Sequence, residues 1–489
     1  MLSLTFYGGI NEIGGNKILL EADGTRIFLD FGMSFKIANT YFAEFLNPRK
    51  CNGILDFVEF GFLPRINGIY RNDFQKHSGF KESAVPSVDG VLLTHAHLDH
   101  SAYIALLHEN MPIYCGIVTK RILKAMQDTG TGSFCDYVVY KENFALRAKK
   151  RGEGVTKLKG AESERPRDIR TFENKAKIPI GNISVMPINV DHSIPGAFGF
   201  VIETSKGNVV YTGDLRFHGY QSEMTDEFVK IASEAQPKAL ICEGTNITEE
   251  SGIGEEEVKT RIAEIVSETK GIVIANFPPR DTDRMRTFYD VAKANGRKLV
   301  INMKQAYMLK LLEAGNALAP SIEDENIRIY VPRKSWGAIT KPAFPEEIVM
   351  QDYLTWERDF VHHPNRVTCD DVRSAQEELI FYCDFFSLKE LIDIRPVENS
   401  CFIWSRCEPF TEDMVLERKK VDEWLKHFQL YPMKEAHASG HAHRPELERL
   451  VKAINPERLY PVHTEHPEVF KEFSNTVGII TPAQNSVLI

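Results

Sequence analysis

The sequence predicts an α/β protein with more than one domain, and three observations support this prediction. The chain has 489 residues, which is too long for a single ordinary hydrophobic core. Its first third contains short apolar segments separated by glycine turns, a pattern typical of antiparallel sheet. From about residue 255 onward, apolar runs of strand length alternate with helical periodicity, which favours a parallel sheet flanked by helices.

Two hairpins are expected in the strand-rich part of the chain. Segments 17–21 and 26–30 flank one glycine-containing turn, and segments 199–204 and 208–212 flank another. The arms are apolar and the turns are polar. We therefore expect stacked antiparallel sheets in this region.

Two stretches of mixed composition are expected to be insertions or mobile loops. They cover residues 35–85 and 147–172. The second stretch opens with the basic run 147–151, which we interpret as part of a solvated loop in preference to a patch that steers substrate.

The middle of the chain predicts helices and strands in alternation. Helices are expected at 255–269 and 282–295, and buried strands at 271–275 and 297–301. A last short strand is expected at 459–462, directly before His463.

Composition and charge exclude several classes of protein. Hydrophobic residues make up 43% and charged residues 26% of the chain, a globular profile. The net charge of −9 argues against a protein that coats nucleic acid, although a nuclease needs only a positive groove. The eight cysteines form no Cys-x-x-Cys pair, which favours reduced thiols and a cytoplasmic location. We expect neither a signal peptide nor a membrane-spanning segment.

A candidate metal-binding segment follows the apolar strand expected at 91–94. Four side chains of ligand type lie within six residues: His95, His97, Asp99 and His100. Alternation along an extended chain places the first two on one side, and a turn before a helix at 101–108 presents the other two. Imidazole nitrogens and carboxylate oxygens at close range suit zinc or a similar divalent ion. A surface cluster of polar residues is the alternative, and the preceding buried strand disfavours it.

Two more candidate ligands come after strands further along the chain. His192 lies in the run 190–196, and Asp214 follows the strand expected at 208–212. Taken alone, each has an ordinary explanation as a turn residue. Their order after residues 95–100 is what makes them candidates.

This order of residues, His-x-His-x-Asp-His followed by His and then Asp, resembles the metallo-β-lactamase superfamily. Segments 7–16, 29–32 and 192–195 also resemble it, and most closely ribonuclease J and its β-CASP relatives. Three further segments resemble β-CASP motifs A, B and C, namely 241–246, 437–442 and 461–465.

The resemblance implies an αββα sandwich with an inserted α/β β-CASP domain. The expected division is 1–218 for the first part of the sandwich, 219–430 for the inserted domain and 431–489 for the return to the sandwich. The resemblance also implies two divalent metal ions, which the ligand set suggests are zinc, with manganese as the alternative.

The roles implied by the resemblance are as follows. One ion would bind His95, His97 and His192; the other would bind Asp99, His100 and His463; and Asp214 would bridge the two ions. Asp30 would orient a ligand histidine. His441 would be the general acid, held and charged by Glu243, and these two residues together with Asp99 form the expected catalytic set. His437 and Ser439 would contact the phosphate of the substrate.

The resulting functional hypothesis is a ribonuclease that hydrolyses single-stranded RNA by a two-metal mechanism, with a metal-bound hydroxide as nucleophile. Within the resembling group, a histidine at position 463 is typical of members that act on RNA. Three alternatives stay open: a nuclease acting on DNA or small nucleotides, another metallohydrolase such as a thioesterase or lactonase, and a binding protein with a degenerate site. Endonuclease and 5′-exonuclease action are not distinguished, nor is the oligomeric state, for which a dimer is one option.

Overall fold

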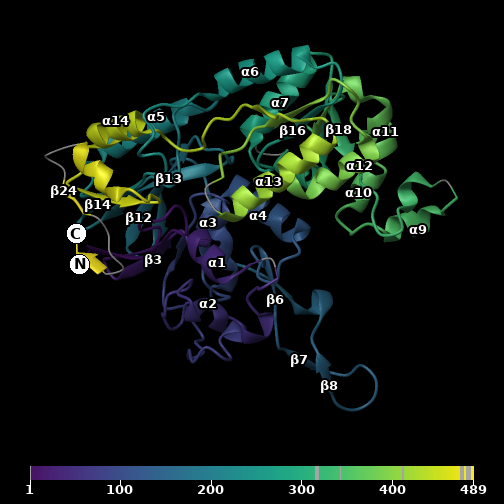
Figure 1. Cartoon of the computed structure of the whole chain (residues 1–489). Helices are drawn as coiled ribbons and strands as arrows, with labels where there is room; N and C mark the ends of the chain where they lie inside the picture. Colours follow the sequence, from purple (N-terminus) through teal and green to yellow (C-terminus); the bar gives the residue numbers. More distant parts are fainter. Residues whose placement is uncertain are drawn as a thin grey trace.

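Three seven-stranded sheets organise the chain in the computed structural model (Figure 1). The structure describes residues 2–43, 45–313, 319–341, 343–409, 412–473, 478–480 and 486–488. In spatial order, the first sheet contains β10 (Ile169–Phe172), β5 (Ile113–Gly116), β4 (Gly90–Leu92), β3 (Thr25–Leu29), β2 (Lys17–Ala22), β1 (Leu2–Gly8) and β25 (Ser486–Leu488). The second contains β11 (Ile178–Ile180), β12 (Ile183–Val190), β13 (Ala197–Thr204), β14 (Gly207–Tyr211), β15 (Ala239–Glu243), β23 (Arg458–Val462) and β24 (Gly478–Ile479).

The first two sheets pack face to face and are covered by helices on their outer sides. Leu4 and Leu29 of the first sheet share one buried cluster with Phe200 and Tyr460 of the second. Helix α4 (Ile117–Thr129) packs against the first sheet, and α5 (Ser222–Glu234) and α14 (Arg444–Ile454) cover the second (Figure 1). This is an αββα sandwich, and the predicted fold class is confirmed.

The third sheet forms a separate layer of parallel strands with helices on both faces. Its order is β19 (Arg366–Val367), β18 (Ile327–Tyr330), β17 (Lys298–Asn302), β20 (Leu379–Tyr382), β16 (Val273–Asn276), β21 (Cys401–Trp404) and β22 (Lys434–Glu435). Its pairings, as far as the structure describes them, are parallel. The helices on one face are α6 (Glu255–Glu268), α7 (Thr282–Ala294) and α8 (Met303–Leu312), and those on the other are α11 (Cys369–Ser374), α12 (Leu391–Ile394) and α13 (Glu412–His427). Two short helices, α9 (Glu346–Gln351) and α10 (Arg358–Val361), complete the set.

Two expectations about the sheets need correction. The segment after residue 218 was expected in the inserted domain, but β15 pairs with β14 and β23 and belongs to the second sheet. At the other end, β22 extends the third sheet beyond residue 430.

The first sheet is not purely antiparallel, because β3, β4, β5 and β10 pair in parallel. Short apolar runs do not reveal strand direction, which depends on the partner strand.

The segment 35–85 is a packed structure and not a mobile loop. It contains α1 (Phe35–Tyr41) and α2 (Leu55–Glu59), and it buries Phe57, Phe62 and Phe74 against the sandwich. The Phe57 and Phe62 rings contact edge to face, with centroids 6.0 Å apart. The aromatic residues of this segment form a small core although their spacing in the sequence has neither helical nor strand periodicity. Periodicity therefore did not predict the packing.

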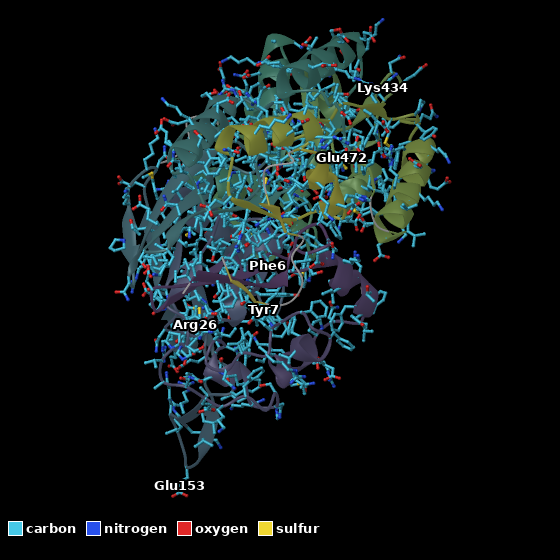
Figure 2. All side chains as sticks on the ribbon, turned by 90° about the vertical axis from the view of Figure 1, so that its left-hand side faces the viewer. Phe6, Tyr7, Arg26, Glu153, Lys434 and Glu472 are labelled. Carbon is cyan, nitrogen blue, oxygen red and sulfur yellow. The ribbon has the colours of Figure 1, made fainter. Side chains whose placement is uncertain are left out.

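The segment 147–172 contains a hairpin that projects from the body. Strands β7 (Leu146–Ala148) and β8 (Val155–Lys157) pair antiparallel, and Glu153 lies at the far end of the projection (Figure 2). Two further strands at its base, β6 (Val139–Lys141) and β9 (Glu164–Pro166), also pair. Lys149, Lys150 and Arg151 are exposed, in agreement with the interpretation as a solvated segment. None of the described helices is long and apolar enough to cross a membrane.

A buried charge network joins the sandwich to the layer of the third sheet. Glu255 at the start of α6 accepts hydrogen bonds from Arg216 Nη1 at 3.0 Å and from Arg284 Nη2 at 2.9 Å. Arg216 follows β14 of the sandwich, whereas Arg284 lies on α7. All three side chains are fully buried, and Glu255 forms an ion pair with each arginine. Such a network tolerates the loss of one member poorly, because the remaining charges stay buried and uncompensated.

We expect Glu255→Gln to lower the free energy of unfolding by about 3 kcal/mol, because two buried guanidinium groups lose a shared carboxylate. Thermal and denaturant unfolding at fixed metal concentration would measure this loss. Glu256→Gln is the matched control, since Glu256 is exposed in the same helical turn, and it should change stability by less than about 1 kcal/mol. Equal effects of the two substitutions would contradict a structural role for the network.

Candidate metal centre

The predicted ligands lie just beyond the ends of strands from both sheets of the sandwich. Residues 95–100 follow β4 of the first sheet. His192 follows β12 of the second sheet, Asp214 follows β14, and His463 comes directly after β23. Face-to-face packing of the two sheets brings these strand ends to one edge, where residues far apart in sequence meet.

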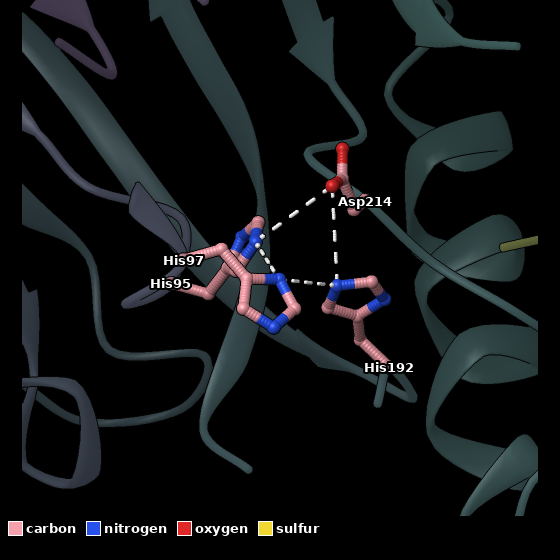
Figure 3. Close-up of side chains that lie close together, drawn as sticks. All are labelled: His95, His97, His192 and Asp214. Carbon is pink, nitrogen blue, oxygen red and sulfur yellow. Dashed lines mark hydrogen bonds and ion pairs between the residues drawn. The ribbon is translucent and has the colours of Figure 1, made fainter. Parts of the chain in front are cut away.

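Three histidines and one aspartate form the first donor group (Figure 3). His97 Nδ1 lies 3.1 Å from His95 Nε2 and 3.1 Å from His192 Nε2. Asp214 Oδ2 lies 3.7 Å from His95 Nε2 and 3.9 Å from His192 Nε2. The donor atoms of this group all lie within 4.8 Å of one another.

Neighbouring groups fix the protonation of these imidazoles. The Gly440 carbonyl can only accept, so His192 donates to it from Nδ1 at 2.6 Å and leaves Nε2 bare. The Thr94 hydroxyl donates to Asp30 and accepts from His95 Nδ1 at 2.9 Å, which leaves His95 Nε2 bare. Burial lowers the pKa of His95 and of His192 well below the ordinary value, and that of His97 to about 4. Neutral imidazoles with inward lone pairs are the metal-binding form.

A second donor group shares Asp214 with the first. It contains Asp99, His100 and His463 as well. His463 Nε2 lies 3.1 Å from Asp99 Oδ2 and 3.5 Å from Asp214 Oδ2, and His100 Nε2 lies 3.0 Å from Asp214 Oδ2. The structure thus brings together all seven residues that were predicted as ligands.

The chemistry of these donors fits divalent metal ions. Both groups combine imidazole nitrogens with carboxylate oxygens, the ligands preferred by zinc and similar ions. Asp214 Oδ1 is buried and has no hydrogen-bond partner among the described residues. A buried carboxylate oxygen without a partner is costly, and a cation removes that cost.

Beside the donor groups, a histidine and a glutamate form a buried ion pair. His441 Nδ1 lies 3.1 Å from Glu243 Oε2 and 3.2 Å from Oε1. Burial disfavours the charged imidazole, but the Glu243 carboxylate outweighs it and raises the pKa of His441 to about 9. The His441 ring centroid lies 5.1 Å from that of His192 and 5.4 Å from that of His463. An imidazole whose protonated form is favoured by Glu243 therefore lies at the edge of the donor groups.

Comparison with known proteins agrees with this geometry. Residues 433–473 match the family model described as "Zn-dependent metallo-hydrolase RNA specificity domain". Ribonuclease J of Mycoplasma pneumoniae is 23% identical over 97% of this chain and 70% of its own length. Ribonuclease J of Pyrococcus abyssi is 22% identical over 95% of this chain and 90% of its own length. Over nearly its whole length the chain is therefore similar to ribonuclease J proteins, in agreement with the resemblance to the metallo-β-lactamase superfamily.

Other ribonuclease J relatives are longer than this chain. The enzyme of Sinorhizobium meliloti is 24% identical over 78% of this chain but only 58% of its own length. A solved structure, titled as a protein of unknown function from Enterococcus faecalis, matches with a TM-score of 0.73 over 100% of both chains at 22% identity. That likeness concerns the fold alone.

Asp30 supports the candidate metal centre by orienting one of its histidines, as the sequence analysis predicted. Its Oδ2 accepts from His100 Nδ1 at 2.8 Å and from the Tyr211 hydroxyl at 2.7 Å. Its Oδ1 accepts the backbone N–H of Thr94 at 2.8 Å. Asp30 therefore holds His100 and the start of the segment 95–100 in one orientation.

The structure shows two supporting threonines that the sequence analysis did not single out. Thr94 links Asp30 to His95, and Thr245 Oγ1 lies 2.8 Å from His463 Nδ1 and 3.1 Å from His441 Nδ1. Each threonine sits within a motif segment or directly beside one, which is the only sequence signal for it. Their side-chain direction becomes evident only from the fold.

The segment 95–100 differs locally from its prediction. The helix α3 (Leu98–Ser101) begins at Leu98, so Asp99 and His100 lie in its single turn, and a 3-10 helix (Ala102–Leu106) follows. Gly32 packs directly beneath this turn, since a Cβ at that position would lie 1.6 Å from the Asp99 carbonyl oxygen. The sequence predicted a longer helix at 101–108, and the structure instead has this tightly packed turn followed by the 3-10 helix.

His437 and Ser439 lie on the same loop as His441, but their described contacts are within the protein. His437 Nδ1 faces Arg284 Nη1 at 3.3 Å, and burial, with Arg284 adding to it, lowers the His437 pKa to about 3. Ser439 Oγ accepts a hydrogen bond from Asn246 Nδ2 at 2.8 Å. Contact of these two residues with a phosphate stays a prediction.

We expect Asp30→Asn to weaken divalent-metal binding by about 10- to 100-fold, because His100 loses the carboxylate that orients it. Competition with a coloured chelator would measure the dissociation constant. Asp23→Asn is the matched control, since Asp23 lies in the β2–β3 turn, at the opposite end of β3 from Asp30, and bonds Ser205. An unchanged affinity in Asp30→Asn would contradict the supporting role of this carboxylate.

Proposed function

We propose that this chain is a metal-dependent ribonuclease that hydrolyses RNA phosphodiester bonds at the centre formed by residues 95–100, His192, Asp214 and His463. One observation carries the proposal: Asp214 is shared by the two donor groups, and it forms a third group with His463 and the charged His441–Glu243 pair. The match of residues 433–473 to a model for RNA specificity in metallohydrolases supports RNA as the substrate.

The proposed centre binds two ions, zinc in the first instance and manganese as the alternative. His95, His97 and His192 hold one ion; Asp99, His100 and His463 hold the other; and Asp214 contributes to both. When bound, two such ions neutralise phosphate oxygens and lower the pKa of coordinated water toward ~7. Asp30, Thr94 and Gly440 keep the ligand imidazoles in the required tautomers.

His441 is the proposed proton donor to the leaving oxygen. Its pKa of about 9 keeps it protonated at neutral pH, and Glu243 remains beside it to stabilise that charge. Leaving-group protonation matters because an RNA alkoxide is a poor leaving group. Thr245 bonds both His441 and His463, which fixes the distance between the proton donor and a metal ligand.

A cavity next to Leu98 supports single-stranded RNA as the substrate. Its volume is about 420 Å³, and its lining includes Arg280, Lys304 and Tyr137. Arg280 Nε has no hydrogen-bond partner among the described residues, and the guanidinium group belongs to a side chain that lines the cavity, which suits a phosphate. The Tyr137 ring lies in the same lining as the cationic side chains, and an aromatic ring in such a setting suits stacking with unpaired bases. The eight free thiols fit a cytoplasmic location.

The decisive experiment incubates the protein with zinc or manganese and with end-labelled single-stranded RNA. Three RNAs are compared, bearing a 5′-monophosphate, a 5′-triphosphate or a 5′-hydroxyl, together with single-stranded DNA of equal sequence. Cleavage of RNA alone supports the proposal, and the product ladder separates endonuclease from 5′-exonuclease action. Cleavage of DNA with RNA left intact would overturn it.

We expect His441→Ala to lower kcat for RNA by about 10²- to 10⁴-fold, the usual range for a lost general acid. Bound metal per chain should not change, because His441 is proposed as a proton donor and not as a ligand. His362→Ala is the control, since His362 is exposed on the third-sheet layer. If metal content falls together with activity, the assignment of His441 as proton donor is wrong.

The pH profile should depend on Glu243. In the wild type, activity that needs protonated His441 persists up to about pH 9 and is lost as the pH rises further, because Glu243 raises the pKa to about 9. Without the carboxylate in Glu243→Gln, this pKa falls toward or below ~6.5, so the loss moves to lower pH. Rate measurements from pH 6 to 10 test this. An unshifted alkaline limb in the variant would count against the His441–Glu243 pair.

A further inference from the structure

A second cluster of metal-binding residues lies outside the proposed catalytic centre. His218 follows Asp214 on the loop after β14, His443 is the residue before α14, and Glu446 lies in the first turn of that helix. Glu446 Oε2 is 3.4 Å from His218 Nδ1 and 3.3 Å from His443 Nδ1. The three side chains are 12%, 10% and 24% exposed, so an ion could enter but would be largely desolvated.

Two imidazoles are directed at the same carboxylate oxygen. The Ser439 carbonyl oxygen accepts a hydrogen bond from His218 Nε2 at 2.9 Å, which turns His218 Nδ1 toward Glu446. Glu446 Oε2 accepts the backbone N–H of His443 at 2.8 Å, and this bond holds the carboxylate beside His443 Nδ1. Three potential metal ligands therefore converge on one point.

The separations between these ligand atoms match those expected around a bound cation. Ligands about 2.0–2.1 Å from a tetrahedral zinc ion lie about 3.3–3.4 Å from each other. The 3.1 Å contacts of His97 with His95 and His192 show a similar spacing at the principal centre.

We propose that His218, His443 and Glu446 bind a further divalent cation of the zinc class, separate from the principal centre. Two imidazoles and one carboxylate are a common zinc set, with a fourth position left for water. Gly252 packs against the opposite side of the His443 ring, because a Cβ there would lie 2.1 Å from His443 Nε2.

This cation would stabilise the loop that carries His441. His218 contacts that loop through the Ser439 carbonyl, and His443 lies two residues beyond His441. The ion thus ties the chain segment after Asp214 to the loop 437–443 and to the start of α14. The inference stands on these contacts and does not require the proposed ribonuclease activity.

The first test is crystallography of the intact protein grown with zinc, with anomalous difference maps on both sides of the zinc absorption edge. We expect a peak between His218, His443 and Glu446 in addition to any at the principal centre. Peaks at the principal centre and none at this cluster would overturn the inference. This measurement needs no variant and no activity.

The second test counts bound metal in His443→Asn. Asparagine caps a helix as well as histidine does but removes the imidazole ligand, so the fold is spared. We expect one zinc ion fewer per chain than in the wild type after dialysis, and the same loss in His218→Ala. His466→Asn is the control: His466 also pairs with a glutamate, at 3.2 Å, but has no third ligand, and metal content should not change. Equal zinc content in all four proteins would contradict the site.

Discussion

The buried Asp214 carboxylate is the constraint on which the rest of the structure depends. Four histidine nitrogens surround its Oδ2 at 3.0 to 3.9 Å, and they come from His95, His100, His192 and His463. A buried anion requires compensating positive charge. Burial lowers the pKa of His95 and of His192, so these imidazoles supply only dipoles, whereas Asp214 and the neighbouring carboxylates raise the pKa of His100. Divalent cations bound at the proposed centre would supply further positive charge to Asp214.

The tautomers of the proposed ligands are set by residues outside the two donor groups. Gly440, on the His441 loop, fixes the tautomer of His192, and Asp30 acts on His95 through Thr94. The loop that carries the proposed proton donor therefore also orients a proposed ligand. Displacement of that loop would affect metal binding and proton transfer together, which is why its anchoring matters.

Two separate sets of contacts anchor the His441 loop. From one side, Arg284 Nη2 bonds the Ala438 carbonyl at 3.3 Å, and Arg216 bonds the Ser439 carbonyl while both guanidinium groups share Glu255. From the other side, the His218 cluster contacts the same Ser439 carbonyl. The buried charges connect the loop to α6 and α7, so the third-sheet layer supports the centre without supplying a ligand to it.

The sequence by itself determined which side chains are candidates for the centre. Histidines and aspartates directly after apolar strands, together with the family resemblance, indicated seven candidate ligands. A strand end holds a side chain rigidly at a sheet edge, and all seven side chains meet in space. Only the tertiary structure decided the rest. It set the direction of the strands, the place of β15 in the second sheet, the packing of 35–85 and the roles of Thr94 and Thr245. Local patterns encode burial and periodicity, whereas partners more than 200 residues apart, such as Thr245 and His463, are chosen by how the two sheets pack.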